Sequence, residues 1–223
     1  MLLKMSVMEN PVVLIADDHE VMRRGVRAVV ELQPGWSVCA EAKNGREAVA
    51  LATKLQPDIV VMDVGMPELN GIEATRQIKK IAPETEILMF TGMENEELIR
   101  EVFEAGARSY IMKTDGKEQL EAALHSLASH KSYFTTQVGE VLFSRFLHAK
   151  KDLTEEGALK LTDREREIVQ LLAEGSSNKE VASELGISSK TVETHRAAIM
   201  KKMNFDSFSD LVRYAIRNHI ISP

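Results

Sequence analysis

The sequence predicts an α/β domain with a doubly wound, five-stranded parallel sheet, followed by a small all-α four-helix helix-turn-helix domain. The first prediction rests on alternating short apolar runs and longer amphipathic stretches through the first 130 residues. The second rests on a change to short amphipathic segments with N-terminal capping residues after residue 160. A chain of 223 residues is long enough to bury a separate core in each of two domains.

Five apolar runs in the first half predict strands, and the segments between them have helical periodicity. Apolar strands separated by helices are typical of a parallel sheet covered on both faces, and five such units fit the flavodoxin-like strand order 2-1-3-4-5. The predicted strands are Val12–Ala16, Trp36–Glu41, Ile59–Met62, Glu86–Phe90 and Ser109–Met112. The predicted helices cover residues 19–32, 45–55, 71–81, 94–105 and 116–129.

The second half has the spacing of capped helices. Thr162 with Glu165, and Ser177 with Glu180, match the capping box, in which two side chains satisfy each other's backbone N–H groups. A short helix, a glycine-containing turn and a longer helix form a helix-turn-helix pattern. The four predicted helices are Thr162–Gly175, Ser177–Leu185, Ser188–Met203 and Ser207–Asn218.

The change of pattern sets the predicted domain boundaries. Residues 133–160 have a helical pattern that ends in the polar segment Ala-Lys-Lys-Asp-Leu-Thr-Glu-Glu-Gly. We therefore expect one domain at 11–130, a helical linker at 131–158 and a second domain at 159–223.

Composition and charge narrow the class of protein. The apolar runs are too short to cross a bilayer, and the first residues lack the pattern of a signal peptide. The single cysteine, Cys39, is expected to be a buried thiol in a reducing cytoplasm. The net charge is −6, but residues from 158 onward carry ten Lys/Arg against nine Asp/Glu. Only the second domain is therefore expected to approach a nucleic acid.

Three aspartates are expected to meet at one edge of the predicted sheet. Asp17 and Asp18 follow the first strand and Asp63 follows the third, and in the predicted strand order these two strands are neighbours. Lys113, after the fifth strand, can bring a cation to the same edge, and Thr91 can supply a hydroxyl. The set would support phosphoryl transfer, with Asp63 as the nucleophile and Lys113 neutralising charge on the phosphoryl oxygens.

Such a carboxylate cluster is costly without a cation, and its oxygen ligands suit Mg²⁺. We expect Asp18, Asp63 and a backbone carbonyl near Gly65 to hold the ion. Asp17 would bind the ion directly or through a water molecule. Each residue also has a structural alternative: the acidic pair can cap a helix, and Asp63 can be a turn residue. Tyr110, on the fifth strand, is a packing aromatic unless the site is real.

These motifs together resemble the receiver domain of bacterial two-component response regulators, over about residues 11–130. The resemblance implies phosphorylation of Asp63 by a sensor histidine kinase, dependence on Mg²⁺, and a switch at Thr91 and Tyr110 that repacks one face of the domain. Many receivers have proline after the lysine, whereas this chain has Thr114, so a cis bond is not assumed there. The matching segments are Asp-Asp at 17–18, Asp-Val-Gly-Met-Pro at 63–67, Asn-Gly at 70–71, Thr-Gly at 91–92 and Tyr-Ile-Met-Lys at 110–113.

The second half resembles the LuxR-type DNA-binding domain, through segments 161–168, 177–182 and 187–196. With the receiver, the whole chain is similar to response regulators of the NarL/FixJ class. A recognition helix reads bases with residues toward its N-terminus. Glu193 could accept from cytosine N4 or simply pair with Lys190 or Arg196, while Thr194 and Ala197 could meet thymine methyl groups. The residues expected to contact phosphates are Lys179, Lys190, Arg196, Lys201 and Lys202.

The sequence thus predicts a cytoplasmic, phosphorylation-dependent transcription regulator that binds DNA, is phosphorylated by a sensor histidine kinase and forms a homodimer when phosphorylated or DNA-bound. We expect no membrane association, and no enzymatic role beyond assisting its own Mg²⁺-dependent phosphorylation and dephosphorylation. Two alternatives remain open. One is a DNA-binding regulator controlled by a partner, and the other is a small phosphohydrolase that uses Asp63 as a transient nucleophile.

Overall fold

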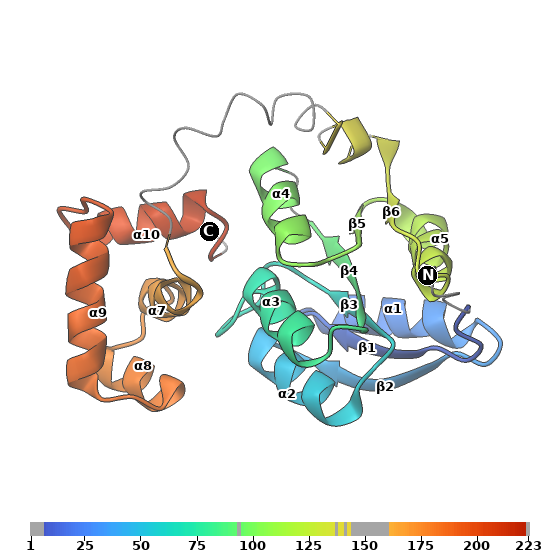
Figure 1. Ribbon diagram of the computed structural model, residues 1–223, viewed down its shortest axis with the longest axis horizontal. Coiled ribbons are helices and arrows are strands. Elements are labelled where there is room, and N and C mark those ends of the chain that lie inside the picture. The colour runs from blue at the N-terminus through green and yellow to red at the C-terminus, as the bar shows by residue number, and fades with distance from the viewer. Residues whose placement is uncertain (1–6, 93–94, 137, 141, 144–160, 222–223) are drawn as a thin grey trace, which may run out of the picture.

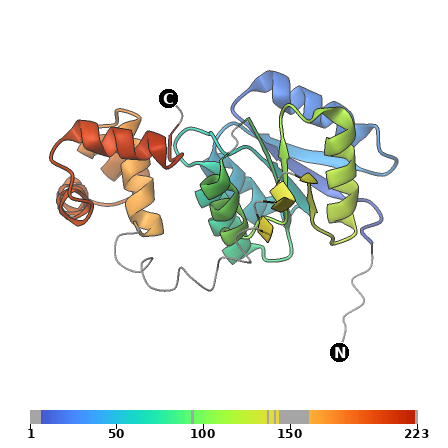
Figure 2. The same cartoon turned by 90° about the horizontal axis from the view of Figure 1, so that it is seen from above.

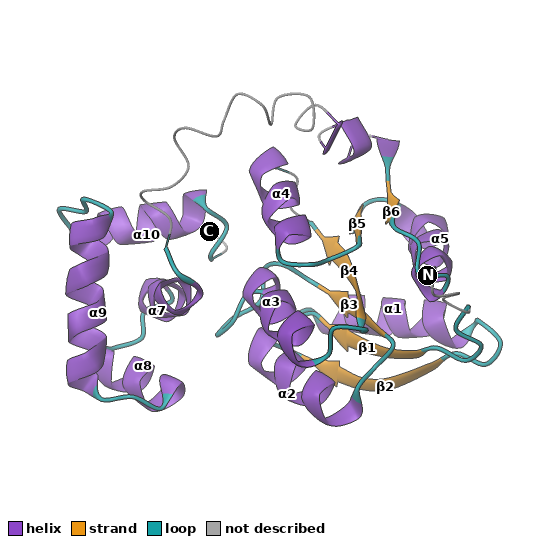
Figure 3. Ribbon diagram, viewed as in Figure 1, coloured by secondary structure: helices purple, strands orange, loops and turns teal. Residues whose placement is uncertain are grey.

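A computed structural model describes residues 7–92, 95–136, 138–140, 142–143 and 161–221. An α/β domain and a smaller helical domain lie side by side in it (Figures 1 and 3). Most of the predicted linker falls outside the described residues. Its early part corrects the prediction at Tyr133–Phe134, which is a strand, whereas the described residues 136, 138–140 and 142–143 are helical as predicted.

The sheet of the first domain has six parallel strands in the order β2-β1-β3-β4-β5-β6, so the prediction of five strands missed one. The sixth strand pairs with β5, where Tyr133 lies opposite Ser109. Two residues are too few to produce a periodic pattern, and only this pairing defines them as a strand. The strands are β1 (Val12–Ala16), β2 (Ser37–Ala42), β3 (Ile59–Met62), β4 (Glu86–Thr91), β5 (Ser109–Met112) and β6 (Tyr133–Phe134).

Helices cover both faces of this sheet (Figures 1 and 2). Valines of α1 and leucines of α5 pack on one face, and apolar residues of α2, α3 and α4 pack on the other. Strand side chains alternate between these two clusters, as the pleat of a sheet requires. The helices are α1 (Glu20–Glu31), α2 (Gly45–Leu55), α3 (Gly71–Ile81), α4 (Glu96–Glu104) and α5 (Gly116–Ala128).

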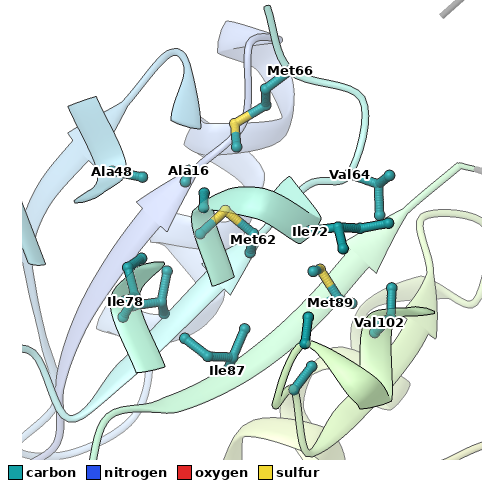
Figure 4. Close-up of a cluster of buried hydrophobic side chains, with 14 of the residues drawn as sticks. Ala16, Ala48, Met62, Val64, Met66, Ile72, Ile78, Ile87, Met89 and Val102 are labelled. Atoms are coloured by element: carbon teal, nitrogen blue, oxygen red, sulfur yellow. The ribbon is translucent and has the colours of Figure 1, made fainter. Parts of the chain in front are cut away.

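A close-packed apolar cluster supports the end of β3 (Figure 4). Met62 is the last residue of β3 and belongs to the same buried cluster as Ile72 of α3 and Met89 of β4. Close packing leaves little room for the strand end to shift. The backbone at Asp63, the next residue, is therefore held in a fixed position.

Cys39 lies on β2, at the edge of the sheet. Its side chain is half-buried rather than buried as predicted. An edge strand has a neighbour on one side only, so its residues are covered less completely. Burial still raises the pKa of this thiol above its ordinary value.

The helical domain spans residues 161–221 of the described chain. The predicted capping boxes are both present: Thr162 with Glu165 opens α7, and Ser177 with Glu180 opens α8. Gly186, with φ of 63°, ends α8 in the left-handed conformation that favours glycine. The helices in this part are α7 (Asp163–Ala173), α8 (Asn178–Leu185), α9 (Ser189–Lys202) and α10 (Phe208–Arg217).

Candidate functional site

The three predicted acidic residues do meet at the carboxyl ends of β1 and β3. Carboxylate oxygens of Asp17, Asp18 and Asp63, together with a ring nitrogen of His19, all lie within 4.8 Å of one another. Asp17 and Asp63 are buried, whereas Asp18 is exposed at the rim. The edge predicted from the strand order is therefore an acidic site that is open on one side.

Lys113 supplies the cation of this site. Its Nζ lies 2.7 Å from Oδ2 of Asp17 and 2.9 Å from Oδ2 of Asp63, so it bridges the two buried carboxylates. Burial raises the pKa of Asp63, Lys113 opposes that shift, and the charge of Asp17 adds to it, with a net rise. Burial alone would lower the pKa of Lys113, but its two carboxylate partners raise it overall. The lysine therefore remains charged at neutral pH.

The donor set fits a small divalent cation such as Mg²⁺. Carboxylate oxygens from three aspartates are available, and Gly65 lies two residues beyond Asp63 in a half-buried loop. Hard oxygen ligands in a partly open site are the arrangement that Mg²⁺ prefers. His19 Nδ1 lies 2.7 Å from Asp18, at the exposed rim of the cluster.

Sequence reasoning missed Arg23, which fixes the acidic loop. This arginine is buried on α1, and its Nη1 donates to the backbone carbonyl of Asp17 at 2.8 Å and to that of Asp18 at 3.3 Å. Its Nε also donates to Glu41 at 3.0 Å. The sequence offered one indication of this role: Arg23 lies one helical turn before Val26, on the face of α1 that is buried.

The loop after Asp63 depends on a close approach at Gly71. A Cβ atom at this position would lie 1.9 Å from the carbonyl oxygen of Asp63, so only glycine fits. Asn70 caps α3, since its side chain accepts from the backbone N–H of Glu73 at 2.9 Å. The Asn-Gly pair therefore sets the path of the chain from Asp63 into α3.

Thr91 and Tyr110 lie on the neighbouring strands β4 and β5, two positions apart in the strand register. Thr91 is the last residue of β4, and its carbonyl accepts from the backbone N–H of Lys113 at 2.9 Å. Tyr110 is fully buried in the core, with its hydroxyl 3.8 Å from the sulfur of Met112. The described residues contain no cis peptide bond, so the Lys113–Thr114 bond is trans.

The predicted recognition helix is α9, which lies on the side of its domain away from the α/β domain (Figures 1 and 2). Val192 and Ile199 face the core, as expected. Exposed on the helix are Lys190, Glu193, Thr194, Ala197 and Lys201. The helix therefore presents its polar side to solvent in this arrangement.

Several of the predicted DNA-contacting side chains also have partners within the domain. Lys190 pairs with Glu193 at 3.2 Å, which is the alternative left open for Glu193. Lys202 pairs with Glu165 of α7 at 2.8 Å. Arg196 lies over the ring of Phe208, 5.3 Å from its centroid, and lines a hollow of about 600 Å³ with the exposed Lys179.

The two domains contact each other mainly through α7. Arg166 reaches Glu101 of α4 at 3.3 Å and Glu73 of α3 at 3.7 Å. Gln170 binds the loop between β3 and α3 with both ends of its amide. Burial raises the pKa of Glu73 to about 7, although Arg76 and Arg166 oppose the shift. The contact is therefore polar, charged and adjacent to the acidic site.

Two family models match the chain. The response regulator receiver domain matches residues 13–125, and the model of bacterial regulatory proteins of the luxR family matches residues 159–215. The two matches coincide with the two structural domains. Among the described residues, no helix combines the length and the apolar character needed to cross a bilayer.

Known regulatory proteins are similar to this chain over nearly its whole length. The transcriptional regulatory protein LiaR of Bacillus subtilis (strain 168) is 37% identical over 210 residues, which cover 94% of this chain and 99% of LiaR. The response regulator protein VraR of Staphylococcus aureus (strain Mu3 / ATCC 700698) is 35% identical over 209 residues, which cover 94% of this chain and 98% of VraR. A structure of the RcsB response regulator from Salmonella typhimurium is 25% identical, with a TM-score of 0.57, covering 93% of this chain and 98% of that one.

Proposed function

This chain belongs to the response regulators that join a receiver domain to a LuxR-type DNA-binding domain, and we propose that Asp63 is its phosphoacceptor and α9 its DNA-reading helix. A sensor histidine kinase would donate the phosphoryl group. The phosphorylated form would then bind DNA and control transcription in the bacterial cytoplasm.

The observation that carries the proposal is the bridge from Lys113 to Asp17 and Asp63. Lys113 favours the ionised, nucleophilic form of the Asp63 carboxylate, which lies at the open end of the sheet. A carboxylate oxygen of Asp63 attacks phosphorus, and the bond to the kinase histidine breaks in the same transfer. Lys113 then stabilises the added negative charge.

Mg²⁺, held by Asp17, Asp18, Asp63 and the carbonyl of Gly65, would neutralise charge on the phosphoryl oxygens during the transfer. Arg23 donates to the backbone carbonyls of Asp17 and Asp18 and so fixes the backbone that carries these two carboxylates. In this way the chain would assist its own phosphorylation and dephosphorylation.

Thr91 and Tyr110 supply the proposed switch. A phosphoryl group adds roughly −1.5 to −2 charge at pH 7, and a nearby hydroxyl that binds it favours one of two packings of the domain. Thr91 ends the strand next to β5, and Tyr110 is buried on β5. Movement of the threonine toward the phosphoryl group would leave space into which the tyrosine can repack.

DNA binding is assigned to the exposed side of α9. Glu193, Thr194 and Ala197 would face base edges, because they lie in the N-terminal part of the helix. The cations at this surface, Lys179, Lys190, Arg196, Lys201 and Lys202, would contact phosphates and give affinity without sequence information. Helix α9 is exposed while the two domains are in contact, so the receiver does not mask it. Phosphorylation would therefore control DNA binding by setting how two copies are spaced on DNA.

A homodimer would provide that spacing. Two recognition helices read half-sites about one helical turn apart when their domains are related by a two-fold axis. In α10, Leu211 belongs to the core, whereas Phe208 is exposed. Phe208, with Arg196 over its ring, and the half-buried Val212 and Ile216 are therefore the apolar side chains of α10 that a second copy could contact.

The test is phosphorylation of the purified chain by acetyl phosphate with Mg²⁺, with the modified residue located by mass spectrometry. The proposal predicts modification of Asp63 and none in Asp63→Asn. The exposed Asp206→Asn serves as the matched control and should be modified like the wild type. Modification elsewhere, or equal incorporation into Asp63→Asn, would contradict the assignment.

A further inference from the structure

A buried glutamine connects the DNA-binding domain to the loop that carries Asp63. Gln170 of α7 is 0% exposed. Its Nε2 donates to the carbonyl of Met66 at 3.1 Å, and its Oε1 accepts from the backbone N–H of Asn70 at 2.9 Å. Glu174, one turn further on, accepts from the backbone N–H of Glu68 at 3.2 Å. Side chains near the end of α7 thus hold three backbone groups of the loop between β3 and α3.

The other end of this loop binds the Asp63 carboxylate. Val64 donates its backbone N–H to Oδ1 of Asp63 at 2.8 Å, and Lys113 lies 2.9 Å from Oδ2. Both carboxylate oxygens therefore already have a donor. A phosphoryl group on Asp63 brings new acceptor oxygens to the Val64 N–H and to Lys113, and we infer that the loop adjusts at Val64 to bind them. Such an adjustment is opposed where Gln170 fixes the loop further along.

We propose that Gln170 is a positioning residue for the phosphoacceptor loop. Its amide holds residues 64–70 in the unphosphorylated geometry and so lowers the affinity of the Asp63 site for a phosphoryl group. The inference rests on the proposed function of Asp63. Because coupling between two binding equilibria is reciprocal, phosphorylation weakens the domain contact by the same factor. This route runs directly from the loop to α7, separately from Thr91 and Tyr110.

Two contacts between α3 and α7 avoid this loop, unlike that of the Asn70 side chain, which donates to the carbonyl of Ile220 at 3.5 Å. Gln77 of α3 donates to Glu167 at 2.9 Å, and Lys80 of α3 pairs with Asp163 at 2.9 Å. These are side-chain contacts between two helices, and they hold the domains together without binding the backbone next to Asp63. Gln77 is therefore a matched control for Gln170: the same residue type at the same interface, away from the loop.

The test measures binding of beryllofluoride, a stable mimic of the phosphoryl group, to the full-length chain with Mg²⁺, followed by fluorine NMR. Gln170→Met keeps the size of the side chain and removes both hydrogen bonds to the loop. We expect this variant to bind more tightly, with half-saturation at a beryllofluoride concentration about fivefold lower than in the wild type. A factor of this size corresponds to the loss of roughly one net hydrogen bond. Hydrogen exchange at the Asn70 amide, which loses its acceptor, should become faster. Gln77→Met should stay within about twofold of the wild type.

Two results would overturn the inference: a Gln170→Met midpoint equal to that of the wild type, or an equal shift in Gln77→Met. Glu174→Ala changes an exposed side chain at the same loop and should shift the midpoint in the same direction by a smaller factor. If Gln170→Met does not fold, the beryllofluoride midpoint of Glu174→Ala tests the inference in its place. A wild type that binds beryllofluoride no better than Asp63→Ala would instead overturn the proposed role of Asp63, and the inference with it.

Discussion

The side chain of Gln170 accepts a hydrogen bond from the backbone N–H of Asn70 at 2.9 Å, although 100 residues of chain separate them. Asn70 is also the cap of α3, and Gly71 after it lies against the carbonyl of Asp63. The DNA-binding domain therefore contacts the receiver within eight positions of the proposed phosphoacceptor. This contact gives the two domains a short physical connection.

Gly71→Ala should destabilise the receiver domain. The new Cβ would lie 1.9 Å from the carbonyl oxygen of Asp63, and relief requires a backbone shift that costs about 1–3 kcal/mol. Urea unfolding followed by circular dichroism measures the change. Gly25→Ala is the matched control, because a Cβ there meets nothing within 4 Å on an exposed part of α1, and it should stabilise by about 0.5–1 kcal/mol. Equal effects of the two substitutions would contradict this account of the loop.

Lys113→Met should slow phosphorylation of Asp63. The substitution keeps an unbranched side chain but removes the cation that lies 2.9 Å from Asp63 and 2.7 Å from Asp17. Loss of one stabilising group of this kind lowers a rate roughly a hundredfold. The measurement is the rate of incorporation from acetyl phosphate at fixed Mg²⁺. The exposed Lys117→Met should keep the wild-type rate, and a Lys113→Met rate within twofold of wild type would exclude a role in the transfer.

Glu73 should make stability depend on pH. Its pKa in the folded chain is about 7, against an ordinary value of 4.5, mainly because it is buried. The folded chain therefore favours the protonated Glu73 carboxyl. The stability that this protonation contributes is fully present below about pH 4.5 and is lost as the pH rises through about 7. The groups facing Glu73 are Arg76 on its own helix, Arg166 and Asp163 on α7, and Glu101 on α4.

Glu73→Gln should flatten this dependence. Between pH 5 and 8, the free energy of unfolding should fall in the wild type by up to about 3 kcal/mol more than in the variant. Urea titrations at several pH values provide the comparison. Glu118→Gln, at an exposed position of α5, should follow the wild-type curve. Identical curves for Glu73→Gln and wild type would show that Arg166 and Arg76 fully compensate the burial.

Lys201→Ala should weaken DNA binding without changing sequence preference. Lys201 is exposed near the end of α9, where it would contact a phosphate. Each lost phosphate contact lowers the slope of log affinity against log salt by about 0.9. Affinity for a duplex enriched by the wild type from a random pool, and for unrelated duplexes, measured at several salt concentrations, checks both points. Lys54→Ala, on the receiver, should leave the slope unchanged, and an altered sequence preference in Lys201→Ala would assign the residue to base reading.

Much of the fold could be predicted because the information is local. Three of the five predicted strands have the observed bounds, and the capping boxes at Thr162 and Ser177 are present. Alternating apolar runs and caps depend only on neighbouring residues. The sixth strand could not be found this way, since Tyr133 and Phe134 are strand residues only through their pairing with β5.

The site was predicted where the strand order brings its residues together. Asp17, Asp63 and Lys113 each follow a strand, so parallel topology alone places them at one edge. Arg23 and Gln170 were missed for a different reason. Their role depends on which backbone carbonyl or amide lies opposite them, and that follows from packing between segments far apart in sequence.

The central claim, phosphorylation-dependent DNA binding through Asp63, is tested most directly by the affinity of wild type and Asp63→Ala for a pool of random duplexes at fixed salt, with and without acetyl phosphate and Mg²⁺. The account predicts that the phosphodonor tightens binding of the wild type alone and enriches one sequence. Equal binding by both proteins, whatever the donor, would contradict it and assign control to a partner instead.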